Sequence, residues 1–147
     1  MKQPKIVTVE SIPGRLALRI GWADGTESVV DVSTPVNDLG ALESIRSPEA
    51  FAEASVGEWG WSVEWPGDVE MAAHNLYRMA KEQQGEAFPV EEFEGWLSRN
   101  GLSLTQAAQA LGLSRRTIAY YKGGHQPIPK IVGLACKGWD VERRGAS

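Results

Sequence analysis

The last third of the chain constrains the fold more than any other part, because helix start and stop signals alternate along it. Ser103 and Ser114 each precede a short run of helix-forming residues, as N-cap residues do. Gly112 and Gly123 follow those runs, and glycine commonly ends a helix. The pattern predicts two short helices joined by a very short turn, at 104–111 and 115–122.

The same kind of signal predicts a helix on each side of this pair. Residues 90–99 place Phe93, Trp96 and Leu97 on one face of a helix. Pro129 then opens a fourth helix, since proline is favoured in the first helical turn. We therefore expect an all-α module of four or five helices.

Small residues occur where the two central helices would meet. A helix-turn-helix needs a small residue at the contact, a glycine in the turn and a branched apolar residue on the second helix, and Ala108, Gly112 and Ile118 stand at these places. With Gly123-Gly124 behind it, the stretch 101–118 resembles the lambda-repressor-like (Cro-type, XRE) family. The resemblance implies double-stranded DNA as a partner and a helix that reads the major groove.

Two positions depart from the family's pattern. Leu104 follows the first cap, where the family often has a glutamine that contacts phosphate, so phosphate contacts must come from other residues. Lys122 stands before the trailing glycines, where an acidic residue is usual, and it adds positive charge.

The candidate DNA-binding residues lie at the start and on the outer side of the 115–122 helix. Arg115 and Arg116 begin it, and arginine suits the O6 and N7 acceptors of guanine. Tyr120 lies one turn after Arg116, while Ile118 faces inward. Backbone amides at Ser103 and the cations after the helix would contact phosphates. Such contacts position the protein on the DNA but do not select a base sequence. The expected DNA-binding residues are Ser103, Ser114, Arg115, Arg116, Thr117, Ala119, Tyr120, Lys122, His125 and Lys130.

The charge distribution favours different partners for the two parts of the chain. Residues 1–100 hold 8 Lys/Arg and 17 Asp/Glu, a net charge of −9, whereas residues 101–147 hold 7 Lys/Arg and 2 Asp/Glu, a net charge of +5. No acidic residue occurs between Gly101 and Trp139. A basic segment suits nucleic acid, although a purely structural helical bundle with a solvated basic face would carry the same charges.

The first part of the chain predicts a small β meander. Alternating apolar and polar residues predict strands at 6–10, 15–22 and 28–32. Asp24-Gly25 fits a tight hairpin turn between the last two strands. We expect a break in regular structure at 35–40.

Short helices and strand pieces follow the meander. Residues 41–45 predict one or two helical turns, and Ser47 caps a short helix that begins at Pro48. Residues 55–65 predict strand pieces around a glycine turn. Asp68 is expected to cap a longer amphipathic helix at 69–82.

These segments also resemble an uncharacterised bacterial family, DUF2442. Arg19 to Thr26, Ser47 to Phe51 and Val63 to Asp68 carry the likeness, which extends over about residues 5–80. It implies a small α+β fold and no established chemistry. Gln83 to Pro89 predicts a linker. We expect an α+β chain with a meander-plus-helices domain and an all-α helix-turn-helix domain, at 1–84 and 85–147.

The sequence predicts no catalytic residue, metal ligand set or cofactor, so an enzyme is the weakest hypothesis. Cys136 is the single cysteine and lies in an apolar stretch, so we expect it in the core. His74 has no second ligand at metal spacing. No apolar run approaches the length of a membrane span, and the first residues lack a signal-peptide pattern, so we expect a cytoplasmic protein without membrane contact.

Two functions remain open from the sequence. One is a transcriptional regulator that reads DNA as a homodimer, with half-sites about 34 Å apart, and uses the N-terminal module for dimerisation or sensing. The other is an antitoxin-like protein whose N-terminal module binds a partner protein while the helix-turn-helix controls their operon. Trp22, Trp59, Trp61 and Trp65 form either a small core or an exposed patch, because alternating Trp59, Trp61 and Trp65 would share one strand face.

Overall fold

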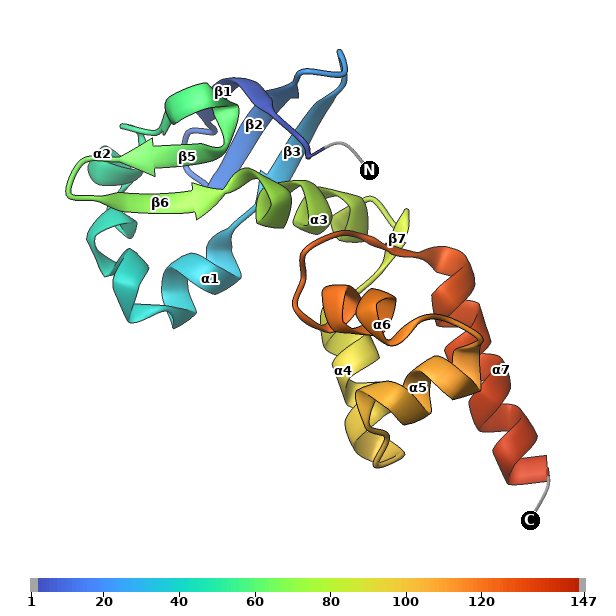
Figure 1. Cartoon of the computed structure of the whole chain (residues 1–147). Helices are drawn as coiled ribbons and strands as arrows, with labels where there is room; N and C mark the ends of the chain where they lie inside the picture. The colour runs from blue at the N-terminus through green and yellow to red at the C-terminus, as the bar shows by residue number, and fades with distance from the viewer. Residues whose placement is uncertain (1–2, 146–147) are drawn as a thin grey trace. The chain divides into compact units, whose positions relative to one another are not determined.

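The structure, a computed structural model, describes residues 3–145 and comprises two compact units, Met1–Gln83 and Gln84–Ser147 (Figure 1). The N-terminal unit combines two small antiparallel sheets with helices. The C-terminal unit is helical apart from one pair of two-residue strands. The predicted α+β class is therefore confirmed, and each unit has its own hydrophobic core.

The first sheet is the predicted meander. β1 (Ile6–Ser11), β2 (Ala17–Trp22) and β3 (Glu27–Asp31) are antiparallel and adjacent in this order. Gly25, at φ +88°, supplies the left-handed conformation in the hairpin between β2 and β3. Ile20 is fully buried on the core side of the sheet.

The second sheet was only partly predicted. It consists of β4 (Ser55–Val56), β5 (Ser62–Trp65) and β6 (Val69–Ala72), all antiparallel, with the one-turn 3-10 helix η2 (Glu58–Gly60) between the first two strands. The expected strand pieces around a glycine turn correspond to β4 and β5.

The expected helix at 69–82 is wrong over its first turn, which is strand β6. Asp68 does not cap a helix: at φ +60° it ends the tight turn that joins β5 to β6. Val69 and Met71 both face the core, which is the two-residue period of a strand. Helix α3 (Ala73–Gln83) begins only after them.

The expected break at 35–40 is also wrong, because α1 (Ser33–Asp38) occupies most of it. Pro35 lies in the first turn of α1. The backbone N–H groups of a first turn make no hydrogen bond within the helix, so proline, which lacks this group, is tolerated there. The Asp31 carboxylate accepts from the backbone N–H of Ser33 at 2.8 Å and thereby helps to start the helix. Val36 then packs into the core.

Two further short helices agree with the sequence analysis. They are the 3-10 helix η1 (Gly40–Ile45) and α2 (Pro48–Phe51). The Ser47 hydroxyl accepts from the Ala50 N–H at 3.2 Å, as expected of an N-cap.

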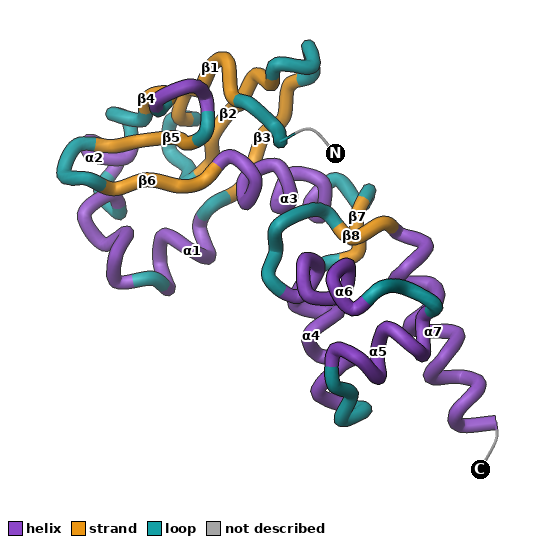
Figure 2. The backbone as a smooth tube through the Cα atoms, in the orientation of Figure 1, coloured by secondary structure: helices purple, strands orange, loops and turns teal. Residues whose placement is uncertain are grey.

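The C-terminal unit contains the four predicted helices, and the first three have the predicted ends. They are α4 (Val90–Arg99), α5 (Leu104–Leu111), α6 (Arg115–Lys122) and α7 (Lys130–Gly145). β7 (Ala87–Phe88) pairs with β8 (Ile128–Pro129) beside the start of α7 (Figure 2). Pro129 does not open the fourth helix, because it pairs in strand β8, and the helix begins one residue later and extends to Gly145. The buried core includes Phe93, Trp96, Ala107, Ile118, Tyr121, Val132 and Cys136.

Asp140 joins α7 to the end of α4. Its carboxylate accepts hydrogen bonds from the Trp96 indole at 3.1 Å, the Arg99 guanidinium at 3.0 Å and the Asn100 amide at 3.1 Å. Burial alone raises the pKa of Asp140, but these hydrogen bonds and the charge of Arg99 outweigh it and hold that pKa below its ordinary value of 3.8. The carboxylate is therefore a charged anchor for α7.

Candidate nucleic-acid interface

The joint between α5 and α6 is closely packed around small residues. Ala107 and Ala108 of α5 and Ile118 of α6 are all buried. Gly112 adopts φ +70° at the end of α5, and the following N–H, of Leu113, donates to the carbonyl of Ala108 at 3.0 Å. This joint fixes which side of α6 faces the core and which side faces solvent.

The start of α6 is set by a cap. The Ser114 hydroxyl accepts from the backbone N–H of Thr117 at 3.1 Å and lies 2.9 Å from the Thr117 hydroxyl. The two hydroxyls therefore contact each other at the N-terminus of the helix. Arg115 and Arg116 follow this cap and are both exposed.

A second group of contacts holds Arg116 along the outer side of α6. Its Nε and Nη2 donate to the Tyr120 hydroxyl at 2.9 and 2.7 Å, and its guanidinium carbon lies 5.2 Å from the centre of the Tyr120 ring. The Tyr120 ring in turn meets the His125 ring at 5.8 Å. The three side chains form a connected row, whereas Arg115 makes no hydrogen bond or ion pair within the described residues.

The remaining candidates lie around α6 with different exposure. Thr117 and Ala119 are half-buried, while Lys122, His125 and Lys130 are exposed. Lys122 ends α6 and Lys130 begins α7, so both cations lie near helix ends.

The start of α5 differs from the expectation in detail. Ser103 and Gln106 form a capping box: the Ser103 hydroxyl accepts from the Gln106 N–H at 3.1 Å, and Gln106 Oε1 accepts from the Ser103 N–H at 2.9 Å. The Ser103 amide is therefore not available to a phosphate while this box is closed. The side-chain amide nitrogen of Gln106 lies at the same exposed helix start, and the Ser-x-x-Gln spacing could have drawn attention to it.

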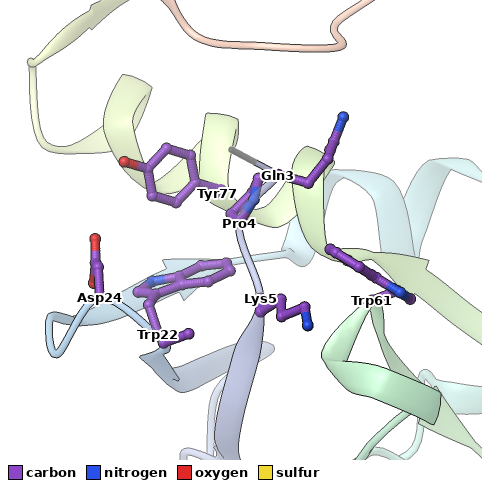
Figure 3. Close-up of a pocket in the computed structure, with 8 residues that line it drawn as sticks. Gln3, Pro4, Lys5, Trp22, Asp24, Trp61 and Tyr77 are labelled. Atoms are coloured by element: carbon purple, nitrogen blue, oxygen red, sulfur yellow. The ribbon is translucent and has the colours of Figure 1, made fainter. Parts of the chain in front are cut away.

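The N-terminal unit contains a cavity of about 630 Å³ (Figure 3). Trp22 and Tyr77 meet edge to face at 5.2 Å on one side of it, and the Lys5 ammonium lies 4.9 Å from the centre of the Trp61 ring on the other. Asp24 lies at the rim, where its carboxylate accepts from Thr26. Three aromatic rings, together with the oppositely charged Lys5 and Asp24, thus line the cavity.

The tryptophans divide between the two predicted alternatives, and Trp59, Trp61 and Trp65 do not share one face. Trp22 and Trp65 are buried, whereas Trp59 and Trp61 are 74% and 44% exposed. The difference arises because η2 and a left-handed Trp59, at φ +60°, interrupt the strand alternation ahead of β5.

The N-terminal unit matches a known protein family. The model of DUF2442, a protein family of unknown function, matches residues 6–82. The chain belongs to this family. The match confirms the resemblance noted in the sequence and ends before α4, so the α5–α6 pair lies outside it.

A solved structure also resembles this DUF2442 protein over nearly its whole length. It is the crystal structure of "Putative DNA Binding Protein NE0471" from Nitrosomonas europaea, with 43% sequence identity and a TM-score of 0.64. The similarity covers 96% of this chain and 89% of that one. No curated protein matches the chain in sequence.

Within residues 3–145 of this DUF2442 protein, no helix is both long and apolar enough to cross a membrane. The same residues hold no group of three or more His, Cys, Asp or Glu side chains placed to bind a metal ion. Cys136 is buried as expected, and burial, with the charge of Asp140, raises the pKa of its thiol to about 12.

Proposed function

We propose that this protein is a transcriptional regulator that binds double-stranded DNA by placing α6 in the major groove. The observation that carries the proposal is the outer side of α6. Arg115, Arg116 and Tyr120 are exposed there, and Ile118 and Tyr121 are buried in the core on the opposite side. A short, firmly packed helix with cations at its start matches the needs of groove insertion.

The two arginines have different roles in this proposal. Arg116 is held by the Tyr120 hydroxyl through Nε and Nη2. The Nη1–Nη2 end of its guanidinium still has donors that point away from these bonds, and two parallel donors fit O6 and N7 of guanine. Arg115 has no such restraint and is placed to contact either a base or a phosphate.

Phosphate contacts come from the cations around α6 and from the start of α5. Lys122 and Lys130 supply charge, and the side chain of Gln106 replaces the contact that Leu104 cannot make. Each neutralised phosphate releases counterions, so the affinity must fall as salt rises.

Two further observations support the proposal. Residues 101–139 contain no acidic side chain that would repel the DNA backbone. The Nitrosomonas europaea protein, which is named as a DNA-binding protein, is similar over 96% of this chain, and that coverage includes part of the C-terminal unit.

The proposal is tested by selecting duplexes from random DNA with the full chain and measuring the affinity of the winners at several salt concentrations. We expect enrichment of a short sequence and an affinity that falls steeply with salt. Enrichment of no sequence, together with binding that does not respond to salt, would rule the proposal out.

A second function is favoured by the exposed tryptophans of the N-terminal unit. Trp59 and Trp61 are both exposed in this unit, whose residues 1–83 hold 7 Lys/Arg and 13 Asp/Glu, a net charge of −6. Exposed aromatic residues are enriched at protein interfaces. We propose as the alternative an antitoxin-like role, in which this surface binds a basic partner protein. Purification of the tagged chain from its native host, with Trp59→Ala as the comparison, would reveal a stoichiometric partner that the variant loses; absence of any such partner would contradict it.

A further inference from the structure

One face of α7 is apolar and exposed. Ile131, Leu134 and Val141 are 72%, 66% and 61% exposed, although large aliphatic side chains are usually buried. With Gly138 they follow a spacing of three, four and three residues, which places all four on one stripe of a helix. Val132, Gly133 and Cys136 occupy the opposite, buried face. We call these four residues the α7 stripe.

The α7 stripe borders a shallow groove against α5. Ala110 and Leu111 of α5 and Ala135 and Trp139 of α7 line this groove, whose volume is about 400 Å³. The apolar surface therefore extends beyond the helix itself. Continuous exposed apolar surface of this kind marks an interaction site.

From this surface and its charges we propose that the α7 stripe is a homodimer interface, in which two copies of the chain pair their α7 helices in parallel. In the heptad that the stripe defines, Lys130, Lys137 and Arg144 flank one side, and Glu142 flanks the other. In a parallel pair, each residue of the cationic flank of one helix lies next to the residue on the other flank of the partner whose number is higher by five. Lys137 of each copy then meets Glu142 of the other, twice by symmetry.

Antiparallel pairing would have the opposite electrostatic result. It would place the cationic flanks of the two copies side by side, so that Lys137 faces its own counterpart and Lys130 faces Arg144. Like charges that face each other in this way repel. The charges beside the α7 stripe thus favour binding of a second copy of the chain, with its α7 helix parallel to the first.

The size of the surface predicts a dimer of moderate affinity. The stripe covers about one and a half heptads, and a stable interface usually needs about 800 Å² from each partner. The dimer would supply a second α6 for a second half-site, and in this respect the inference rests on the proposed function, but dimer formation does not depend on DNA. Failure of DNA binding and failure of dimerisation are therefore separate results.

The first test is the oligomeric state of the full chain without DNA, measured by sedimentation equilibrium over a roughly hundredfold range of concentration. We expect a monomer–dimer equilibrium that Leu134→Lys weakens by about tenfold or more. Gly138→Glu should act likewise without disturbing the monomer, because a Cβ at Gly138 has no neighbour within 4 Å. Leu39→Lys, at an exposed leucine of the N-terminal unit, is the matched control. A chain that stays monomeric, or a dimer affinity that neither α7 variant changes, overturns the proposal.

The direction of pairing is tested separately. Lys137→Glu and Glu142→Lys should each weaken the dimer by roughly threefold to tenfold, and the double exchange should restore it. Leu134→Cys should form an intermolecular disulfide on oxidation, since the two introduced thiols meet in a parallel pair, while the buried Cys136 stays reduced. No restoration and no disulfide would exclude parallel pairing.

Discussion

The Asp140 anchor gives the clearest energetic prediction for the C-terminal unit. Replacing Asp140 with alanine removes the acceptor of three hydrogen bonds and leaves the Trp96 indole N–H, on an almost completely buried side chain, without that partner. A hydrogen bond to a charged group contributes about 1.5–3 kcal/mol and an unsatisfied buried donor costs about 1–3 kcal/mol. Because Asp140 is 22% exposed and Arg99 is 63% exposed, solvent screening reduces the sum.

We therefore expect Asp140→Ala to lower the free energy of unfolding by about 2–4 kcal/mol. Asp140→Asn keeps one acceptor oxygen and should cost about half as much. Urea denaturation followed by circular dichroism at 222 nm measures both, with Glu142→Ala as an exposed control on the same helix. An Asp140→Ala protein as stable as the wild type would refute the assignment of Asp140 as the anchor of α7.

The pH dependence follows from the lowered pKa of Asp140. A carboxyl group whose folded-state pKa lies below its ordinary value of 3.8 stabilises the fold above that value. The contribution is lost as the pH falls through the folded-state pKa. The stability difference between wild type and Asp140→Ala should therefore be complete at neutral pH and shrink once the pH drops below about 4. A difference that is constant down to pH 2 would contradict this account.

Three further predictions concern buried positions. Ile118→Ala should destabilise the C-terminal unit by about 2–5 kcal/mol in urea denaturation, because the side chain is fully buried, while Ile118→Val should cost about 1 kcal/mol. The Cys136 thiol should react with iodoacetamide at pH 8 only after unfolding, since its pKa is raised to about 12; fast labelling of the folded chain would contradict this. Gly60→Ala should destabilise the N-terminal unit, because Gly60 adopts φ +77° and a Cβ there would overlap the Ile6 carbonyl oxygen; unchanged thermal stability would count against that contact.

Helix ends in the C-terminal unit were predictable because they depend on local chemistry. Ser103 and Ser114 each bond to an N–H three residues ahead, and Gly112 takes a left-handed conformation that other residues avoid. These interactions are visible in a short window of sequence. Even the contact of Arg116 with Tyr120 follows from their spacing of four residues on one helix face.

The features that were predicted wrongly depend on contacts between segments that are distant in the sequence. Val69 and Met71 fit either a helix with Leu76 or a strand beside β5, and pairing with β5 decided the matter. Trp59 and Trp65 are the same residue type, yet one is exposed and the other buried, because η2 turns the chain between them. The sequence also predicted a helix after Pro129. It did not show which of the two apolar faces of this helix packs against the core and which one forms the exposed α7 stripe.

The central claim, that α6 reads DNA, is tested most directly by the affinity of Arg115→Ala and Arg116→Ala for the selected duplex, measured by fluorescence anisotropy at one salt concentration. Arg19→Ala is the matched control, because it removes the same charge from β2 of the N-terminal unit. We predict that each α6 variant loses about 1–3 kcal/mol of binding free energy, roughly 5- to 150-fold in affinity, and that the control binds like the wild type. Wild-type affinity in both α6 variants would show that α6 is not the reading helix.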